Sequence, residues 1–164
     1  MLNLSELNAL DREKFTRLIG PVFENSPWIA EETWAARPFA SRSQLHGALC
    51  KTVARADDDA KLELIRAHPD LAGRIKLTSA SRREQATAKL NELSEEELAQ
   101  LNYYNGAYRD KFGFPFVICA RLNDKEKILE AFPTRLQNSI DEEKRIALDE
   151  IFKIADLRLL DILE

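Results

Sequence analysis

A side chain that exchanges protons near neutral pH is the first requirement for most acid–base chemistry. The sequence of 164 residues carries two histidines, His46 and His68. His46 lies inside a helical pattern, where a surface or core role is expected. His68 stands at the predicted end of a helix, and Pro69 restricts the backbone next to it. A side chain fixed in this way suits proton transfer, and a purely structural His68 is the equal alternative.

Residues 68–80 contain proline, aspartate and glycine and are predicted to form a loop. Asp70 is expected to accept a backbone hydrogen bond in a turn of this loop. Arg74 and Lys76 are expected only to solvate it.

Ser81 and Glu84 follow the loop with the spacing of a capping box, in which Glu84 accepts a hydrogen bond from the Ser81 backbone N–H. In that interpretation, which the residues alone favour, Gln85 is an ordinary helical residue. The functional alternative uses the same geometry. The free N–H groups of a helix N-terminus can bind a small polar anion, and Glu84 and Gln85 would add acceptors and donors.

Arg158 is a charge within an apolar run, because its neighbours four residues away are Ile154 and Ile162. Burying an unpaired guanidinium is costly, so Arg158 requires a partner. An internal carboxylate would make it a structural ion pair. A substrate carboxylate or carbonyl would make it a binding fork. Both alternatives are open from the residues alone.

The elements that must position these side chains are predicted to be helices. Only five glycines occur, and Ala, Leu, Glu, Lys and Arg are found throughout. Start and stop signals predict about eight helices in an all-α bundle, a single domain over residues 1–164. The last helix is predicted from about Ile140 to Ile162. Phe116 to Ala120 is a short apolar run that is either extended or helical.

Several function classes are excluded by composition and by missing motifs. The net charge of −4 argues against a nucleic-acid partner, and no apolar run is long enough for a membrane span. No phosphate-binding glycine loop, HExxH or GxSxG motif is present, and the His, Cys and acidic residues show no metal-ligand spacing. A reaction without metal or cofactor is therefore expected. Cys50 and Cys119 are expected to be free thiols in a reducing cytoplasm, because no signal peptide is recognised.

Longer motifs carry a resemblance to a known family, the 2-oxo-4-hydroxy-4-carboxy-5-ureidoimidazoline (OHCU) decarboxylases of purine breakdown. The stretches that resemble it lie in the family's order and span nearly the whole chain: Phe23–Ala30, Arg37–Phe39, Arg66–Gly73, Leu77-Thr78, Ser81-x-x-Glu84-Gln85, Phe112–Ile118, Arg135-Leu136-x-Asn138 and Leu157–Leu159. One departure is visible. The family commonly has Ala-Gly-Leu where this chain has Ala88-Lys89-Leu90, and Lys89 is predicted one helical turn beyond Gln85, near the same face.

The resemblance implies an all-α fold, usually a homodimer, and release of CO2 from a small ureide to give (S)-allantoin in urate degradation. It implies His68 as the catalytic acid, with Glu84 and Arg158 as further catalytic residues that position the substrate. The substrate contacts that it implies are Pro69, Ser81, Glu84, Gln85, Phe116, Val117, Ile118, Cys119 and Ala120.

The chemistry of the residues agrees with this assignment. Loss of CO2 leaves an electron pair on a ring carbon beside a C=N group that can absorb it, so no metal or organic cofactor is required. One proton must then reach one face of the ring, and His68 can supply it. A non-catalytic alternative is a ureide-binding or scaffold module of the same pathway, with a groove formed by Trp28, Trp34 and Phe39.

Overall fold

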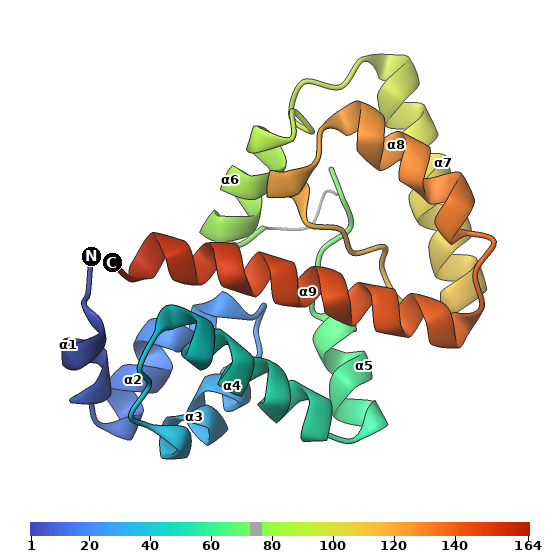
Figure 1. Ribbon diagram of the computed structural model, residues 1–164. Coiled ribbons are helices and arrows are strands. Elements are labelled where there is room, and N and C mark those ends of the chain that lie inside the picture. Colours follow the sequence, from blue (N-terminus) through green and yellow to red (C-terminus); the bar gives the residue numbers. More distant parts are fainter. Residues whose placement is uncertain (73–76) are drawn as a thin grey trace. The chain divides into compact units, whose positions relative to one another are not determined.

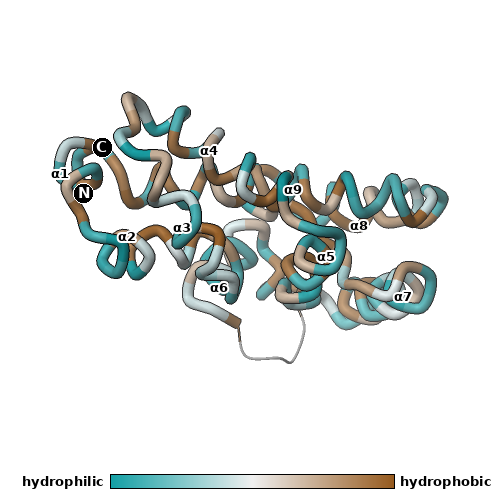
Figure 2. The backbone as a smooth tube through the Cα atoms, turned by 90° about the horizontal axis from the view of Figure 1, so that it is seen from below, coloured by the Kyte–Doolittle hydropathy of each residue, from teal (hydrophilic) through white to brown (hydrophobic). Residues whose placement is uncertain are grey.

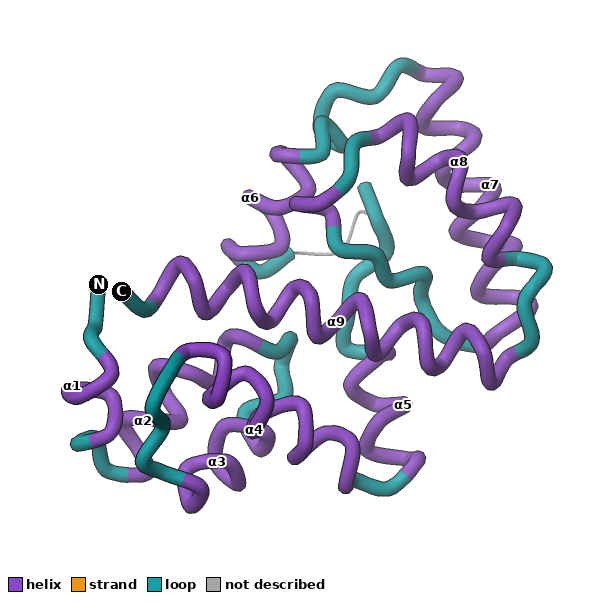
Figure 3. The backbone as a smooth tube through the Cα atoms, in the orientation of Figure 1, coloured by secondary structure: helices purple, strands orange, loops and turns teal. Residues whose placement is uncertain are grey.

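The computed structural model describes residues 1–72 and 77–164, so Gly73, Arg74 and Lys76 lie outside the described residues. The described residues form nine α-helices and three 3-10 helices and contain no β-strand (Figures 1 and 3). This confirms the all-α prediction, with about the predicted number of helices. The α-helices are α1 (Leu4–Asn8), α2 (Arg12–Ile19), α3 (Trp28–Thr33), α4 (Arg42–Arg55), α5 (Asp58–Arg66), α6 (Ser79–Thr87), α7 (Glu95–Phe112), α8 (Lys125–Arg135) and α9 (Ile140–Ile162), and the 3-10 helices are η1 (Gly20–Val22), η2 (Trp34–Ala36) and η3 (Ala120–Leu122).

Contacts within the chain group its residues into two compact units. Unit 1 comprises Met1–Ala67 and Phe152–Glu164, and unit 2 comprises His68–Ile151. Helix α9 therefore contributes its first half to unit 2 and its second half to unit 1. The single domain over residues 1–164 stays a prediction.

Unit 1 is built from α1 to α5 and the end of α9, and its helix starts follow the side chains that the sequence offers as caps. Asp11, Ser41 and Asp57 each accept a hydrogen bond from a backbone N–H in the first turn of α2, α4 and α5. Hydrophobic residues recur along one side of the longer helices (Figure 2). The side chains that are buried completely include Leu7, Phe15, Ile19, Ile29, Leu45, Leu49 and Val53.

Unit 2 contains α6, α7, α8, η3 and the first half of α9, with α7 and α8 side by side (Figure 1). Ser94 and Glu97 form the predicted capping box at the start of α7, and Gly113 ends the helix in the left-handed conformation, with φ of 77°. The core is aromatic, and four rings lie around the fully buried Tyr108 or stack on its neighbours: Phe112, Phe114, Phe116 and Phe132.

A buried polar network ties the aromatic core of unit 2 to α9. Glu143 is completely buried and accepts hydrogen bonds from Tyr108 Oη at 2.6 Å, Arg135 Nε at 2.8 Å and Asn138 Nδ2 at 2.9 Å. Arg135 Nη1 also donates to the Val117 carbonyl at 2.6 Å. Because the contacts of Tyr108 and Arg135 are buried, the network fixes the backbone at Val117 as well as the helices around it.

None of the helices in residues 1–72 and 77–164 has both the length and the apolar character required to cross a bilayer.

Candidate active site

His68 opens unit 2, two residues after α5 ends at Arg66, so the predicted helix end is nearly correct. Its side chain is buried, with 7% of the residue exposed. The loop that follows is tied to α6, because the Ala72 backbone N–H donates to Gln85 Oε1 at 2.9 Å. Ala72 and Gln85 belong to different predicted motifs, and this hydrogen bond brings them together.

Helix α6 starts earlier than the capping box predicted. Thr78 is its N-cap and accepts a hydrogen bond from the Ser81 backbone N–H at 3.2 Å, so Ser81 lies inside the helix. The hypothesis that Glu84 closes a capping box with Ser81 is therefore wrong. The reason is local: threonine also caps helices, and the Thr78 side chain accepts the hydrogen bond from the Ser81 N–H three residues further on.

The new register of α6 puts three polar side chains on one buried face. Ser81, Glu84 and Gln85 are spaced i, i+3 and i+4, and each is at most 9% exposed. The buried face of an ordinary amphipathic helix is apolar. Polar side chains there need polar partners, and Gln85 Oε1 has one in the Ala72 backbone N–H.

The end of α6 also corrects a prediction. Lys89 lies beyond the helix, in the left-handed conformation with φ of 62°, and its side chain is exposed. The backbone N–H of Lys89 donates to the Ala86 carbonyl and that of Leu90 to the Gln85 carbonyl, both at 3.0 Å. This is the Schellman pattern, whose left-handed position is usually glycine. Lys89 therefore does not share a face with Gln85, and the glycine common in the family has a backbone explanation.

Residues 116–119 form neither helix nor strand, the backbone of Cys119 is extended, and η3 begins at Ala120, so the helical alternative is wrong up to Cys119. All five side chains are buried. Within the part of the chain that the structure describes, the backbone N–H groups of Phe116, Val117 and Ile118 donate no hydrogen bond. The Cys119 N–H donates to Glu150 Oε1 at 3.2 Å.

The polar face of α6 and the segment 116–120 are neighbours in unit 2. Helix α6 packs against η3. Burial raises the pKa of the Cys119 thiol, and the nearby carboxylates of Glu150 and Glu84 raise it further. Glu84 therefore lies near Cys119, at the end of this segment.

Arg158 belongs to unit 1, in the second half of α9. Its Nη2 donates to Glu24 Oε1 at 2.9 Å, and its Nη1 donates to the Pro21 carbonyl at 3.2 Å. Both charged side chains are almost completely buried, with 6% of the Arg158 and 1% of the Glu24 side chain exposed. Glu24 is therefore the internal carboxylate that the ion-pair alternative requires.

Two buried carboxylates of α9 were missed from the sequence, Glu143 and Glu150. They lie seven residues apart on α9, among the buried Ala147, Ile151 and Ile154. An acidic residue on an apolar stripe was the available signal, and it is the same signal that drew attention to Arg158. Glu24 gave no such signal, because it lies outside any long helix.

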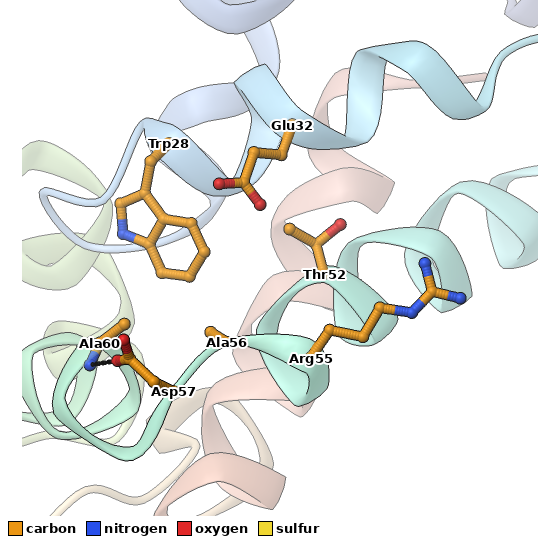
Figure 4. A pocket seen from close by; sticks show the side chains of 7 residues that line it. All are labelled: Trp28, Glu32, Thr52, Arg55, Ala56, Asp57 and Ala60. Atoms are coloured by element: carbon orange, nitrogen blue, oxygen red, sulfur yellow. Dashed lines mark hydrogen bonds between the residues drawn. The ribbon is translucent and has the colours of Figure 1, made fainter.

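Unit 1 carries two surface hollows that share the side chains of Glu32, Thr52 and Arg55. The first has a volume of about 550 Å³, with Trp28 and Glu32 on one wall (Figure 4). The second, of about 650 Å³, is lined in part by Phe39. Trp34 lines neither: its ring lies under the Arg37 guanidinium and its Nε1 donates to the Leu10 carbonyl. The predicted groove of Trp28, Trp34 and Phe39 is therefore wrong.

Comparison with known proteins gives one consistent result. The sequence model of the family described as OHCU decarboxylase matches residues 8–160. The chain is 40% identical over 160 residues to the 2-oxo-4-hydroxy-4-carboxy-5-ureidoimidazoline decarboxylase of Haloferax volcanii, covering 98% of this chain and 95% of that relative. It is 39% identical over 167 residues to the protein of the same name from Amia calva, with 99% and 95% covered.

Solved structures agree on the fold. A crystal structure described as (S)-allantoin synthase superposes with a TM-score of 0.81 at 31% identity, covering all of this chain and 54% of that one. A crystal structure described as OHCU decarboxylase in the presence of (S)-allantoin gives a TM-score of 0.71 at 24% identity, with 93% and 97% covered.

Proposed function

The chain belongs to the OHCU decarboxylase family, and we propose from that premise which of its residues carry the reaction. The protein is a carboxy-lyase that converts OHCU to (S)-allantoin in urate degradation. The observation that carries this activity is a family match over residues 8–160 together with 40% identity to a decarboxylase of nearly the same length. The residue roles that follow are our inference.

His68 is the proton donor. After CO2 leaves, the neighbouring C=N group takes up the electron pair, and the ureido-bearing ring carbon must then be protonated on one face to give a single enantiomer. A positioned imidazole contributes typically ~10²–10⁴ in rate to such a step near neutral pH. The burial of His68 and the tie of its loop to α6 support this role, because a donor held in one place delivers its proton to one face.

The polar face of α6 and the extended segment hold the ureide. Glu84 accepts hydrogen bonds from ureido or ring N–H groups, and Ser81 and Gln85 add a hydroxyl and an amide. The backbone N–H groups of Phe116, Val117 and Ile118 suit the carbonyl oxygens of the ring, with Cys119, Ala120 and Pro69 completing the contacts. The packing of α6 on η3 supports this arrangement.

Arg158 holds the carboxylate of OHCU or the ring oxygen that gains charge as CO2 departs. Its ion pair with Glu24 supports this role instead of excluding it, because the pair and the Pro21 carbonyl fix the guanidinium plane. A fixed planar donor can then recognise a second anion with the correct orientation.

We further infer a homodimer that works in the cytoplasm without a cofactor. The two cysteines are free, which fits a reducing compartment. The reaction itself needs only a proton donor and an electron-accepting C=N group.

The direct test mixes the purified protein with freshly generated OHCU and follows circular dichroism of the product. Catalysis predicts a signal of (S)-allantoin that appears faster than in buffer. Binding of OHCU without faster formation of chiral product would support the ureide-binding or scaffold alternative and contradict the enzyme.

A further inference from the structure

We propose that Arg109 and Asn105, on α7, are positioning residues for the reaction because they hold the loop that follows His68. The inference rests on the proposed role of His68 as proton donor and adds the residues that keep this donor in place. Neither side chain belongs to a motif that sequence analysis singled out.

The contacts are made to consecutive residues of the loop. Arg109 Nε donates to both carboxylate oxygens of Asp70, at 2.9 and 3.1 Å. Asn105 Nδ2 donates to the Leu71 carbonyl at 3.0 Å. Because Asn105 and Arg109 are four residues apart on one helix, they lie on the same face of α7.

Helix α6 adds a third contact at the next residue, where the Ala72 N–H donates to Gln85 Oε1. Three successive residues, Asp70, Leu71 and Ala72, are therefore each held by a different side chain. Pro69 restricts the backbone between this anchored stretch and His68. The position of the imidazole thus depends on contacts two to four residues further along the chain.

These contacts contribute little to the stability of the fold. The Asp70 and Arg109 side chains are 24% and 43% exposed, and ion pairs with that exposure stabilise a fold little. Asn105 is only 7% exposed, and its Oδ1 is buried without a hydrogen-bond partner in the described residues. A buried amide that leaves one of its polar atoms without a hydrogen bond lowers the stability of the fold. We therefore infer that the Asn105 side chain serves to orient the loop.

The earlier expectation for Asp70 changes accordingly. It was predicted to accept a backbone hydrogen bond in a turn, whereas the structure shows its carboxylate paired with a guanidinium from a helix 39 positions away. A carboxylate that pairs across the unit restricts the loop more strongly than a local turn does.

The test is a double-mutant cycle with Asp70→Ala, Arg109→Gln and the combined variant. Each single variant is expected to lower kcat for OHCU about tenfold, because displacing a donor by even 1 Å is costly. KM should change less than about twofold, since the substrate contacts are elsewhere. The double variant should be no slower than either single variant, because both break the same contact.

The matched control is Arg17→Gln, which removes an arginine from an exposed ion pair with Glu13 on α2. It should leave kcat unchanged. All variants should keep the far-UV circular dichroism of the wild type and melt within about 2 °C of it, since surface pairs add little stability.

Three results would overturn the inference: unchanged kcat in the single variants, losses that multiply in the double variant, or losses that follow a drop in melting temperature. If the wild type and Arg17→Gln fail to produce (S)-allantoin, the proposed function itself fails. If these two are active and Arg109→Gln is equally active, only the positioning role is lost.

Discussion

At the scale of single residues, Arg158 forms the internal ion pair, and the substrate role that we propose for it has to be compatible with that pair. Its guanidinium is held by Glu24 and by the Pro21 carbonyl, and both charged side chains are buried. A buried pair of this kind is weak evidence for stability, because desolvation of both charges offsets much of their attraction. An orienting role for Glu24 accounts for the same contacts.

Replacing Arg158 with lysine tests this role. Arg158→Lys should lower kcat/KM by about 10- to 100-fold, since a hydrogen bond to a charged group is worth roughly 1.5–3 kcal/mol and a point charge cannot replace a planar fork. Steady-state kinetics with OHCU measures the effect. The control is Arg42→Lys, which changes an arginine whose Nε lies 3.8 Å from the partly exposed carboxylate of Asp156. Equal kcat/KM in both variants would rule out a substrate role for Arg158.

Sequence could find the residue Arg158 but not its partner. The charge was visible because its helical neighbours are apolar, whereas Glu24 lies 134 positions away and no local pattern connects the two. The same holds for Asp70 and Arg109. Long-range pairs of this kind are decided by tertiary packing, which one sequence does not display.

At the scale of elements, helix α6 shows where prediction from sequence fails. The last helix was predicted from Ile140 to Ile162 and the structure agrees, because a long apolar periodicity sets its extent. Helix α6 is short, and Thr78, Ser79 and Ser81 all have side chains that can cap a helix. Capping preferences could not choose among these three residues, so the start of α6 was predicted too late. Glu84, which lies on the buried polar face, was consequently predicted to be part of a capping box.

The end of α6 gives a stability prediction. Lys89→Gly should raise the free energy of unfolding by about 1 kcal/mol, because a residue with a Cβ in the left-handed region is disfavoured by roughly 1–2 kcal/mol, part of which glycine loses to chain entropy. Urea unfolding at constant pH measures the change.

The control for this prediction inserts the same residue elsewhere in α6. Arg83→Gly places glycine at an exposed position inside the helix, where it should lower stability by about 1 kcal/mol. A higher free energy of unfolding in Lys89→Gly and a lower one in Arg83→Gly would confirm the C-terminal geometry of α6. A loss of stability in Lys89→Gly would show that the side chain of Lys89, and not its backbone, matters there.

At the scale of the whole molecule, stability should depend on pH through the helix caps. Hydrogen bonds from first-turn backbone N–H groups lower the pKa of Asp11 and Asp124 below their usual value of 3.8, and a bond from the Ser94 N–H lowers that of Glu97 below 4.5. A carboxylate whose pKa is lower in the folded state stabilises the fold above its unfolded pKa. That stability is lost as the pH falls through the folded pKa.

The free energy of unfolding should therefore decrease as the pH is lowered below about 5, as measured by urea unfolding between pH 7 and pH 3. Asp124→Asn is the matched variant, because asparagine caps a helix but does not titrate. Its loss of stability over the same range should be smaller than that of the wild type. An equal loss would mean that the cap at Asp124 does not contribute to the pH dependence.

The central claim is that His68 delivers the proton that makes allantoin chiral, and stereochemical analysis of the product tests it most directly. The measurement follows circular dichroism while OHCU is generated in the presence of wild-type protein or of His68→Ala. With folding verified by far-UV circular dichroism, His68→Ala should yield allantoin no faster than buffer alone and without an excess of the S enantiomer. Formation of (S)-allantoin by His68→Ala at the wild-type rate would contradict the account.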